Sequence, residues 1–376
     1  MATLIKASNE WATRPADQRF KSLADLHSAV TDRRDRSRTA TVAVSELRAK
    51  VVDGTVYLNG RADRTAALTH WSFGQLSRFA GAPPSYLRQL PAPLAAECLN
   101  TGLVKYQGEG EDSTAKLLLS VPVVSSSQAL SQVVESLDSP PPLTLRGMTS
   151  DRYSRIWDAD ITSRLIRLAE HGWQPAPAAF DGSRGLYASA HDMFAFMVDN
   201  DRRIFERGPG GGLSRGFFAW NSEVGAASFG IMTFLYEYVC GNHRVWGASN
   251  VSEVRIRHVG DADERAFSQM AVELRKYADS SAADDELKIQ RAGSYQLGAN
   301  KDEVLDAVFG LKVPGLTRAR IVEAYQLAEE HSDWYGNPRS AWGLAGGLTE
   351  IARDLPHADE RVTLDRAAGK VMEMAF

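Results

Sequence analysis

Residues 216–260 read GFFAWNSEVGAASFGIMTFLYEYVCGNHRVWGASNVSEVRIRHVG. Aromatic and β-branched residues dominate this stretch, which is typical of strands buried at the centre of a sheet. Within it, residues 254–258 alternate between apolar and basic or polar side chains, and this alternation predicts a half-buried strand with a basic outer face. Residues 233–240 fit a strand or a helix equally well, because either geometry gathers aromatic side chains on one face.

The segments on either side of this stretch have different periodicities. Before it, residues 193–198 are apolar on both faces and predict a central strand. After it, apolar residues recur at helical spacing from residue 261 onward. We therefore expect an α+β fold, in which a central mixed, mostly antiparallel sheet has helices packed on it and is followed by a helical C-terminal part.

The run Ser139-Pro140-Pro141-Pro142 is typical of a linker, so we place a boundary after it. The predicted units are an N-terminal α/β part (1–142), a central sheet domain (143–260) and a C-terminal helical part packed on the sheet (261–376).

The composition is that of an ordinary globular protein, with 44% hydrophobic and 24% charged residues among 376. The formal net charge of −4 excludes a protein that is basic throughout but leaves local basic faces open. Cys98 and Cys240 make no disulfide framework, so we expect a cytoplasmic protein. The N-terminus has no apolar run of signal-peptide length. Elsewhere, no apolar run reaches the roughly 20 residues that crossing a membrane requires, so we expect no membrane partner.

The central stretch also contains a dense set of polar residues that could form a site. If these side chains act as acids and bases, they would form the active site of an enzyme. Alternatively, they are ordinary polar residues of turns and strand ends. The segment 240–243 has the spacing of half a zinc site, but a second Cys or His pair is missing from the sequence, so we expect no metal and no cofactor. Without a hydrolase or metalloprotease motif, we assign no catalytic residue. The candidate polar site consists of Asn221, Ser222, Glu223, Asn242, His243 and His258.

Arginines cluster beside these aromatic strands. The glycine-rich segment 208–212 lacks the Lys-Ser or Lys-Thr and the following helix of a phosphate-binding loop, so we interpret it as a mobile hairpin connection carrying anion-contacting arginines. The run 33–38 has interleaved acids and is interpreted as a solvated helix end. Aromatic faces that stack bases, together with arginines that follow phosphates, are typical of single-strand binding, although the same aromatics could form core. The predicted nucleic-acid-binding residues are Arg202, Arg203, Arg207, Arg215, Arg255 and Arg257.

Several segments resemble the phage/plasmid-like protein family, the domain of unknown function 932. They are residues 65–91, 145–161, 221–225, 233–248 and 340–354. The most specific of them are the turn Asn221-Ser222-Glu223-Val224-Gly225 and the segment Cys240-Gly241-Asn242, and the resemblance extends from about Asn9 to the C-terminus. It implies a phage, prophage, plasmid or mobile-island setting in a bacterial host, and it transfers no catalytic residues.

These observations predict a phage- or plasmid-associated nucleic-acid-binding protein, which binds or anneals single-stranded DNA in replication or recombination. A homo-oligomer would offer repeated sites that offset the net negative charge. Two alternatives remain open, an enzyme acting on nucleotides or nucleic acid and a host-directed factor that binds another protein. A shared pocket for the polar residues would favour the enzyme, and a groove lined by the arginines would favour nucleic acid.

Overall fold

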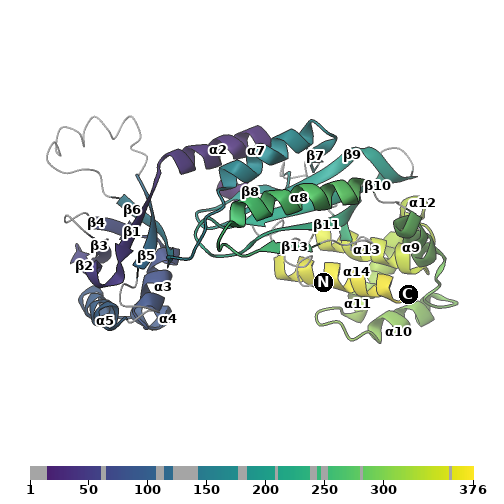
Figure 1. Cartoon of the computed structure of the whole chain (residues 1–376). Coiled ribbons are helices and arrows are strands. Elements are labelled where there is room, and N and C mark those ends of the chain that lie inside the picture. The colour runs from purple at the N-terminus through teal and green to yellow at the C-terminus, as the bar shows by residue number, and fades with distance from the viewer. Residues whose placement is uncertain are drawn as a thin grey trace, which may run out of the picture.

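The structure of the chain is a computed structural model that describes residues 15–60, 65–106, 114–121, 143–176, 184–207, 211–237, 244–246, 253–279, 283–354 and 358–376. For 200–207, 211–212, 235–237, 244–246 and scattered positions elsewhere, only the backbone is described. Helices and strands both contribute large parts of the fold, and the described strands form two separate sheets (Figure 1). The predicted α+β class is therefore confirmed.

The first sheet is mixed. Its strands run in the order β1 (Ser37–Ala43), β5 (Thr114–Ser120), β6 (Leu143–Ser150), β4 (Thr65–Leu68), β3 (Thr55–Asn59) and β2 (Arg48–Val52). The β4–β6 pairing is parallel and the others are antiparallel. Asp53 and Gly54 both have positive φ and form the predicted turn between β2 and β3, because their left-handed conformation suits a two-residue hairpin.

Helices from the segment after β4 pack on the first sheet. They are α3 (His70–Phe79), α4 (Pro84–Leu87) and α5 (Ala92–Lys105), and short 3-10 helices occur at Ala16–Gln18 and Val44–Glu46. Thr69 and Ser72 form a capping box that begins α3, since each side chain accepts the other's backbone N–H. Leu76 of α3 and Leu99 of α5 are completely buried against the sheet.

Strand β6 links the first sheet to the next part of the chain. It begins at Leu143, directly after the predicted boundary, and it pairs with β4 and β5 of the N-terminal part. The first sheet therefore draws strands from both sides of residue 142 and is complete only at Ser150. The division into three units remains a prediction about how the chain is organised.

The second sheet is built around the stretch that the sequence pattern singles out. Its strands run in the order β12 (Arg244–Trp246), β11 (Phe229–Glu237), β10 (Gly211–Asn221), β9 (Met193–Arg207) and β7 (Trp173–Pro175), with β13 (Glu253–Ile256) paired to β11 and β8 (Leu186–Ala188) paired to β9. All of these pairings are antiparallel. Residues 233–237 belong to β11, which settles the choice between strand and helix there in favour of strand.

The two faces of the second sheet have different neighbours. One face is covered by α2 (Leu23–Asp35), α7 (Asp158–Ala169) and α8 (Ala262–Asp279), which lie along it (Figure 1). The side chain of Ser22 caps α2 as expected, because its oxygen accepts the N–H of Asp25 at 3.0 Å. The other face gathers aromatic rings that are at most 3% exposed, and these rings are core rather than an open stacking surface. They are Tyr187, Phe194, Phe196, Phe218, Trp220 and Phe234.

The C-terminal helices form a core of their own at the end of the second sheet that lies away from the first sheet (Figure 1). They are α9 (Ala283–Ser294), α10 (Lys301–Phe309), α11 (Arg318–Glu330), α12 (Ser332–Tyr335), α13 (Ala341–Asp354) and α14 (Ala358–Glu373). Leu213 of β10 joins this core and so connects the helices to the sheet. None of the helices in the described segments is both long and apolar enough to cross a membrane.

The glycine-rich connection is shorter than predicted. Strand β9 continues to Arg207 and β10 begins at Gly211, where the two residues pair with each other. The four arginines expected on a loop therefore lie in strands, because the hairpin keeps its backbone paired almost to its tip, with register shifts near Ser214. These arginines are Arg202, Arg203, Arg207 and Arg215. Residues 208–210, the centre of the predicted loop, lie outside the described residues.

Candidate functional site

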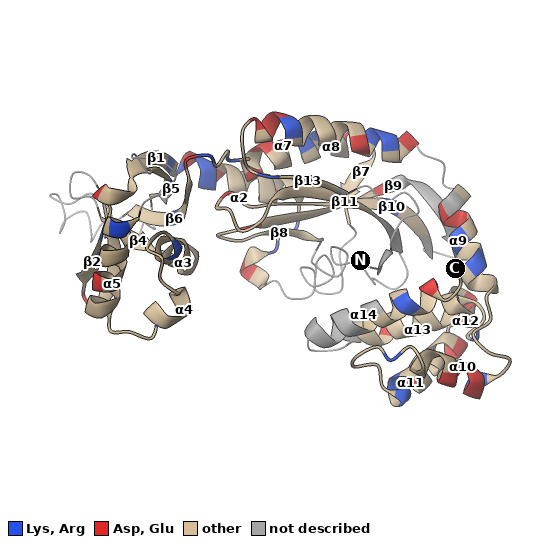
Figure 2. Cartoon of the chain, turned by 60° about the horizontal axis from the view of Figure 1, so that its bottom comes forward, with Lys and Arg blue, Asp and Glu red and all other residues tan. Residues whose placement is uncertain are grey.

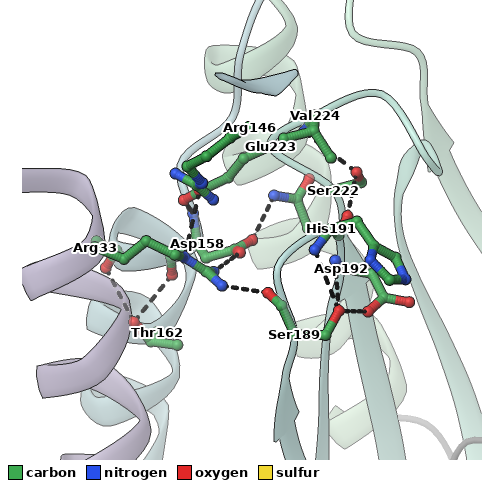
Figure 3. Close-up of polar contacts among 12 residues, drawn as sticks. Arg33, Arg146, Asp158, Thr162, Ser189, His191, Asp192, Ser222, Glu223 and Val224 are labelled. Atoms are coloured by element: carbon green, nitrogen blue, oxygen red, sulfur yellow. Dashed lines mark hydrogen bonds and ion pairs between the residues drawn. The ribbon is translucent and has the colours of Figure 1, made fainter. Parts of the chain in front are cut away.

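The two sheets meet at a buried group of four charged side chains, which we call the ion cluster. Its members are Arg33, Arg146, Asp158 and Glu223. They come from the end of α2, from β6, from the first turn of α7 and from the turn between β10 and β11 (Figure 3). With both carboxyl groups ionised, the two positive and two negative charges of this cluster balance.

Short contacts join the ion cluster across the sheets. The Nη2 atom of Arg146 donates to Oε2 of Glu223 at 2.6 Å, and Nη2 of Arg33 donates to Oδ2 of Asp158 at 2.6 Å. The backbone N–H of Asp158, at the start of α7, also donates to Oε1 of Glu223 at 3.1 Å. A carboxylate is favourable there because the first N–H groups of a helix lack partners within the helix.

Burial sets the electrostatics of the ion cluster. The side chains of Asp158 and Glu223 are each only 1% exposed. Burial, followed by repulsion from Glu223, raises the pKa of Asp158 to about 7, although Arg33 and a hydrogen bond from Asn221 oppose the rise. The pKa of Arg146 is lowered, because burial outweighs its attraction to Glu223.

The predicted polar turn is part of this junction. Asn221 is completely buried, and its Nδ2 donates to Oδ1 of Asp158 at 2.6 Å and to the carbonyl of Ile156 at 2.9 Å. The hydroxyl of Ser222 donates to the carbonyl of His191 (Figure 3) and also accepts the N–H of Ala226. These bonds hold the two ends of the turn and orient Glu223 toward the arginines.

The same turn contacts helix α3 of the first sheet. The carbonyl of Val224 accepts hydrogen bonds from Nε1 of Trp71 at 3.1 Å and from Nε2 of Gln75 at 2.7 Å. Gln75 also accepts the N–H of Met148 in β6. Gly225, with φ of +79°, allows the chain to turn back after this contact. The Asn-Ser-x-x-Gly segment therefore connects the two sheets.

His258 lies at the edge of the junction, next to Tyr153. The two rings are stacked, with centroids 4.9 Å apart, and the Tyr153 hydroxyl donates to the carbonyl of Ser222 at 2.7 Å. Burial lowers the pKa of His258 to about 4, so the ring is neutral at pH 7. Its Nδ1 lies 3.1 Å from the carbonyl oxygen of Ser154. The carbonyl can only accept, so a hydrogen bond here requires the tautomer that is protonated at Nδ1.

The fold thus brings together four of the six predicted polar residues. Asn221, Ser222, Glu223 and His258 all lie at the junction, whereas Asn242 and His243 fall outside the described residues. Among the described residues, no group of three or more His, Cys, Asp or Glu is arranged to hold a metal ion.

Sequence reasoning missed Arg33, Arg146 and Asp158 as members of the site. The run that begins with Arg33 was predicted to be solvated, yet the Arg33 side chain is only 18% exposed and pairs with Asp158. Interleaved acids indicate a solvated helix end only when the fold brings no acid from another part of the chain next to the arginines. The preference for acids in the first turn of a helix is the one signal that marks Asp158.

The predicted nucleic-acid-binding arginines do not share one face. Arg215 is 8% exposed, lies 5.2 Å from the centroid of the Tyr277 ring and donates to the carbonyl of Ala278 under α8. Arg255 is exposed and lies 6.0 Å from the centroid of Trp220, which belongs to the aromatic face. The side chains of Arg202, Arg203 and Arg207 fall outside the described ones.

The alternation predicted for residues 254–258 is confirmed. Val254, Ile256 and His258 are buried, while Arg255 and Arg257 are exposed. Strand β13 places Arg255 on the side away from the core formed with α8, and Arg257 directly follows the end of the strand at Ile256. They are the exposed members of the predicted interface among the side chains that the structure describes.

Gly230 of β11 leaves room for the Trp220 ring next to Arg255. The three residues are neighbours across β10, β11 and β13, and a Cβ atom on Gly230 would lie 2.1 Å from the Trp220 ring. We therefore expect Gly230→Ala to lower the free energy of unfolding by about 1–3 kcal/mol, as overpacking does. Thermal denaturation measures this, with Gly293→Ala as control, since a Cβ atom there meets nothing within 4 Å. Equal stability of the two variants would contradict the predicted contact.

The ion cluster is better suited to joining the sheets than to reacting with a substrate. Both carboxylates are sealed from solvent, and each has an arginine and a neutral donor as partners. Chemistry at these groups would require the junction to open. Comparison with known proteins adds no relative, because no family model matches the chain and neither a curated protein nor a solved structure is significantly similar.

Proposed function

We propose that the protein binds single-stranded DNA and serves, by binding or annealing it, in the replication or recombination of phage or plasmid DNA in a bacterial cytoplasm. The observation that carries this proposal is the exposed pair of Arg255 in β13 and Arg257 directly after the strand's last residue, Ile256. Residues two apart on a strand are about 7 Å apart, close to one nucleotide step of an extended backbone. The resemblance of the chain to a phage- and plasmid-associated family supplies the genetic setting.

The arrangement of charges favours binding over catalysis. The carboxylates Asp158 and Glu223 are consumed by internal partners, so an enzyme would lack a free acid or base at the junction. Arg255 and Arg257 are exposed residues, as contacts to phosphate require. The Trp220 ring beneath Arg255 limits the directions in which that arginine can point.

Replacing Arg255 and Arg257 together with alanine should weaken binding to single-stranded oligothymidylate and reduce its dependence on salt. Each lost phosphate contact lowers the slope of log affinity against log salt by about 0.7 for single strands, because fewer counterions are released. Fluorescence anisotropy at several salt concentrations measures both quantities. Circular dichroism should show the wild-type fold, since both side chains are exposed.

Arg167→Ala and Arg275→Ala are matched controls, because both arginines are exposed on helices that cover the opposite face of the second sheet. They should leave affinity and slope unchanged. Wild-type protein that fails to bind the single strand at low salt would overturn the proposal, and binding to another protein alone would favour a host-directed factor.

A further inference from the structure

A second exposed group lies where helix α3 meets the turn between β8 and β9. The half-buried ring of Trp71 is parallel to the exposed imidazole of His191, with centroids 5.9 Å apart and 17° between the planes. The guanidinium carbon of the exposed Arg78 lies 5.8 Å from the centroid of the Trp71 ring. We call Trp71, Arg78 and His191 the stacked group. It joins helix α3, which packs on the first sheet, to a turn between two strands of the second sheet.

Hydrogen bonds from behind hold the ring of Trp71 and the backbone of His191. Nε1 of Trp71 donates to the carbonyl of Val224, and the backbone N–H of His191 donates to the hydroxyl of Ser189 at 3.2 Å. The carbonyl of His191 accepts a hydrogen bond from the hydroxyl of Ser222. The imidazole of His191 points away from the ion cluster (Figure 3). Rings that are already oriented lose little conformational entropy when another flat group stacks on them.

Basic side chains lie on the α3 side of the stacked group, whereas on the other side Asp192 follows His191 and its carboxylate accepts the hydroxyl of Ser189. Residues 65–96 include His70, Arg78 and Arg88 but contain no Asp and no Glu. Arg88 is exposed and lies 5.2 Å from the centroid of the Phe73 ring, while its Nη2 donates to the carbonyl of His70. Figure 2 shows blue without red on α3. This segment therefore complements a polyanion that also carries flat rings.

We propose that the stacked group is a second contact surface for single-stranded nucleic acid, where a base stacks on His191 and the guanidinium group of Arg78 holds a neighbouring phosphate. Aromatic rings and arginines in such proximity bind single strands without reading their sequence. This inference rests on the proposed function and adds to it a contact region where α3, which packs on the first sheet, meets the β8–β9 turn of the second sheet.

The test uses two probes of equal length, an oligothymidylate and an oligonucleotide that is abasic at every position. His191→Ala should weaken binding of the oligothymidylate about tenfold, the typical effect of losing one stacked base, and leave the abasic strand unaffected. His191→Phe should retain the wild-type affinity, because it keeps a flat ring. Arg78→Ala should weaken both probes by the same factor, since both carry phosphates. His171→Ala, which changes another exposed histidine, should leave both affinities unchanged.

The outcomes separate this inference from the proposed function. If the wild-type protein binds neither probe, both fall together. If it binds, and the double Arg255 and Arg257 variant binds more weakly, but His191→Ala and Arg78→Ala behave like His171→Ala, only the stacked group is refuted. Equal loss for both probes in His191→Ala would refute base stacking.

Photo-crosslinking of the wild-type protein to a DNA oligonucleotide made of 5-iododeoxyuridine tests the surface without any substitution in the protein. Mass spectrometry should find the crosslink on Trp71 or His191, and crosslinks confined to other peptides would overturn the inference. This measurement holds even if a variant folds poorly.

Discussion

Replacing Glu223 with glutamine should lower the free energy of unfolding by about 3–5 kcal/mol. The substitution keeps the shape of the side chain but removes its charge, and it leaves the guanidinium of Arg146, 7% exposed, without an anionic partner at 2.6 Å. A buried charge that loses its partner is costly because water cannot replace the lost interaction. Urea denaturation followed by circular dichroism measures the change.

The exposed pair Arg318–Asp306 is a matched control for this prediction. Its atoms are also 2.6 Å apart, but its side chains are 49% and 67% exposed, so Asp306→Asn should cost less than about 1 kcal/mol. In the double variant Arg146→Met, Glu223→Leu, much of the stability should return, because no buried charge is left unpaired. A loss in Glu223→Gln no larger than in Asp306→Asn would show that the ion cluster does not hold the sheets together.

The second prediction concerns pH, and Asp158 and His258 should act in opposite directions. The pKa of Asp158 rises from 3.8 to about 7 on folding, so the folded state holds one more proton than the unfolded state between these values. Its contribution is therefore lost as pH rises toward 7. The pKa of His258 falls from 6.5 to about 4, so its contribution is lost as pH falls through that range.

Between about pH 4 and 6.5 the contributions of Asp158 and His258 to the pH dependence of stability nearly cancel in the wild-type protein. Replacing either residue alone should reveal the contribution of the other. Relative to wild type, Asp158→Asn should make stability rise with pH by about 1.4 kcal/mol per pH unit, which corresponds to one proton. His258→Phe, which keeps a ring beside Tyr153, should make stability fall with pH by about the same slope. Urea denaturation at several pH values measures these slopes, and equal slopes in both variants would contradict the assignment.

Much of the second sheet could be predicted because its strands carry a local signal. Residues 216–220 and 229–234 combine aromatic and β-branched side chains that need burial on both faces, and the alternation around Arg255 shows which side chains remain outside. The mistaken loop shows the limit of this signal. Glycines at 208–212 indicate a turn, but the pairing of Arg207 with Gly211 across the hairpin decides where the turn begins.

The sequence by itself determined the α+β class, the strands of the central stretch, the cap of α2 at Ser22 and the exposure of Arg255 and Arg257, because each depends on neighbours within a few residues. Only the tertiary structure decided the site. Arg146 meets Glu223 across 77 residues, and Trp71 contacts Val224 across 153. Such contacts depend on how the two sheets pack, and neither spacing nor composition along the chain records that packing, because a buried ion pair uses the same residue types as a solvated surface.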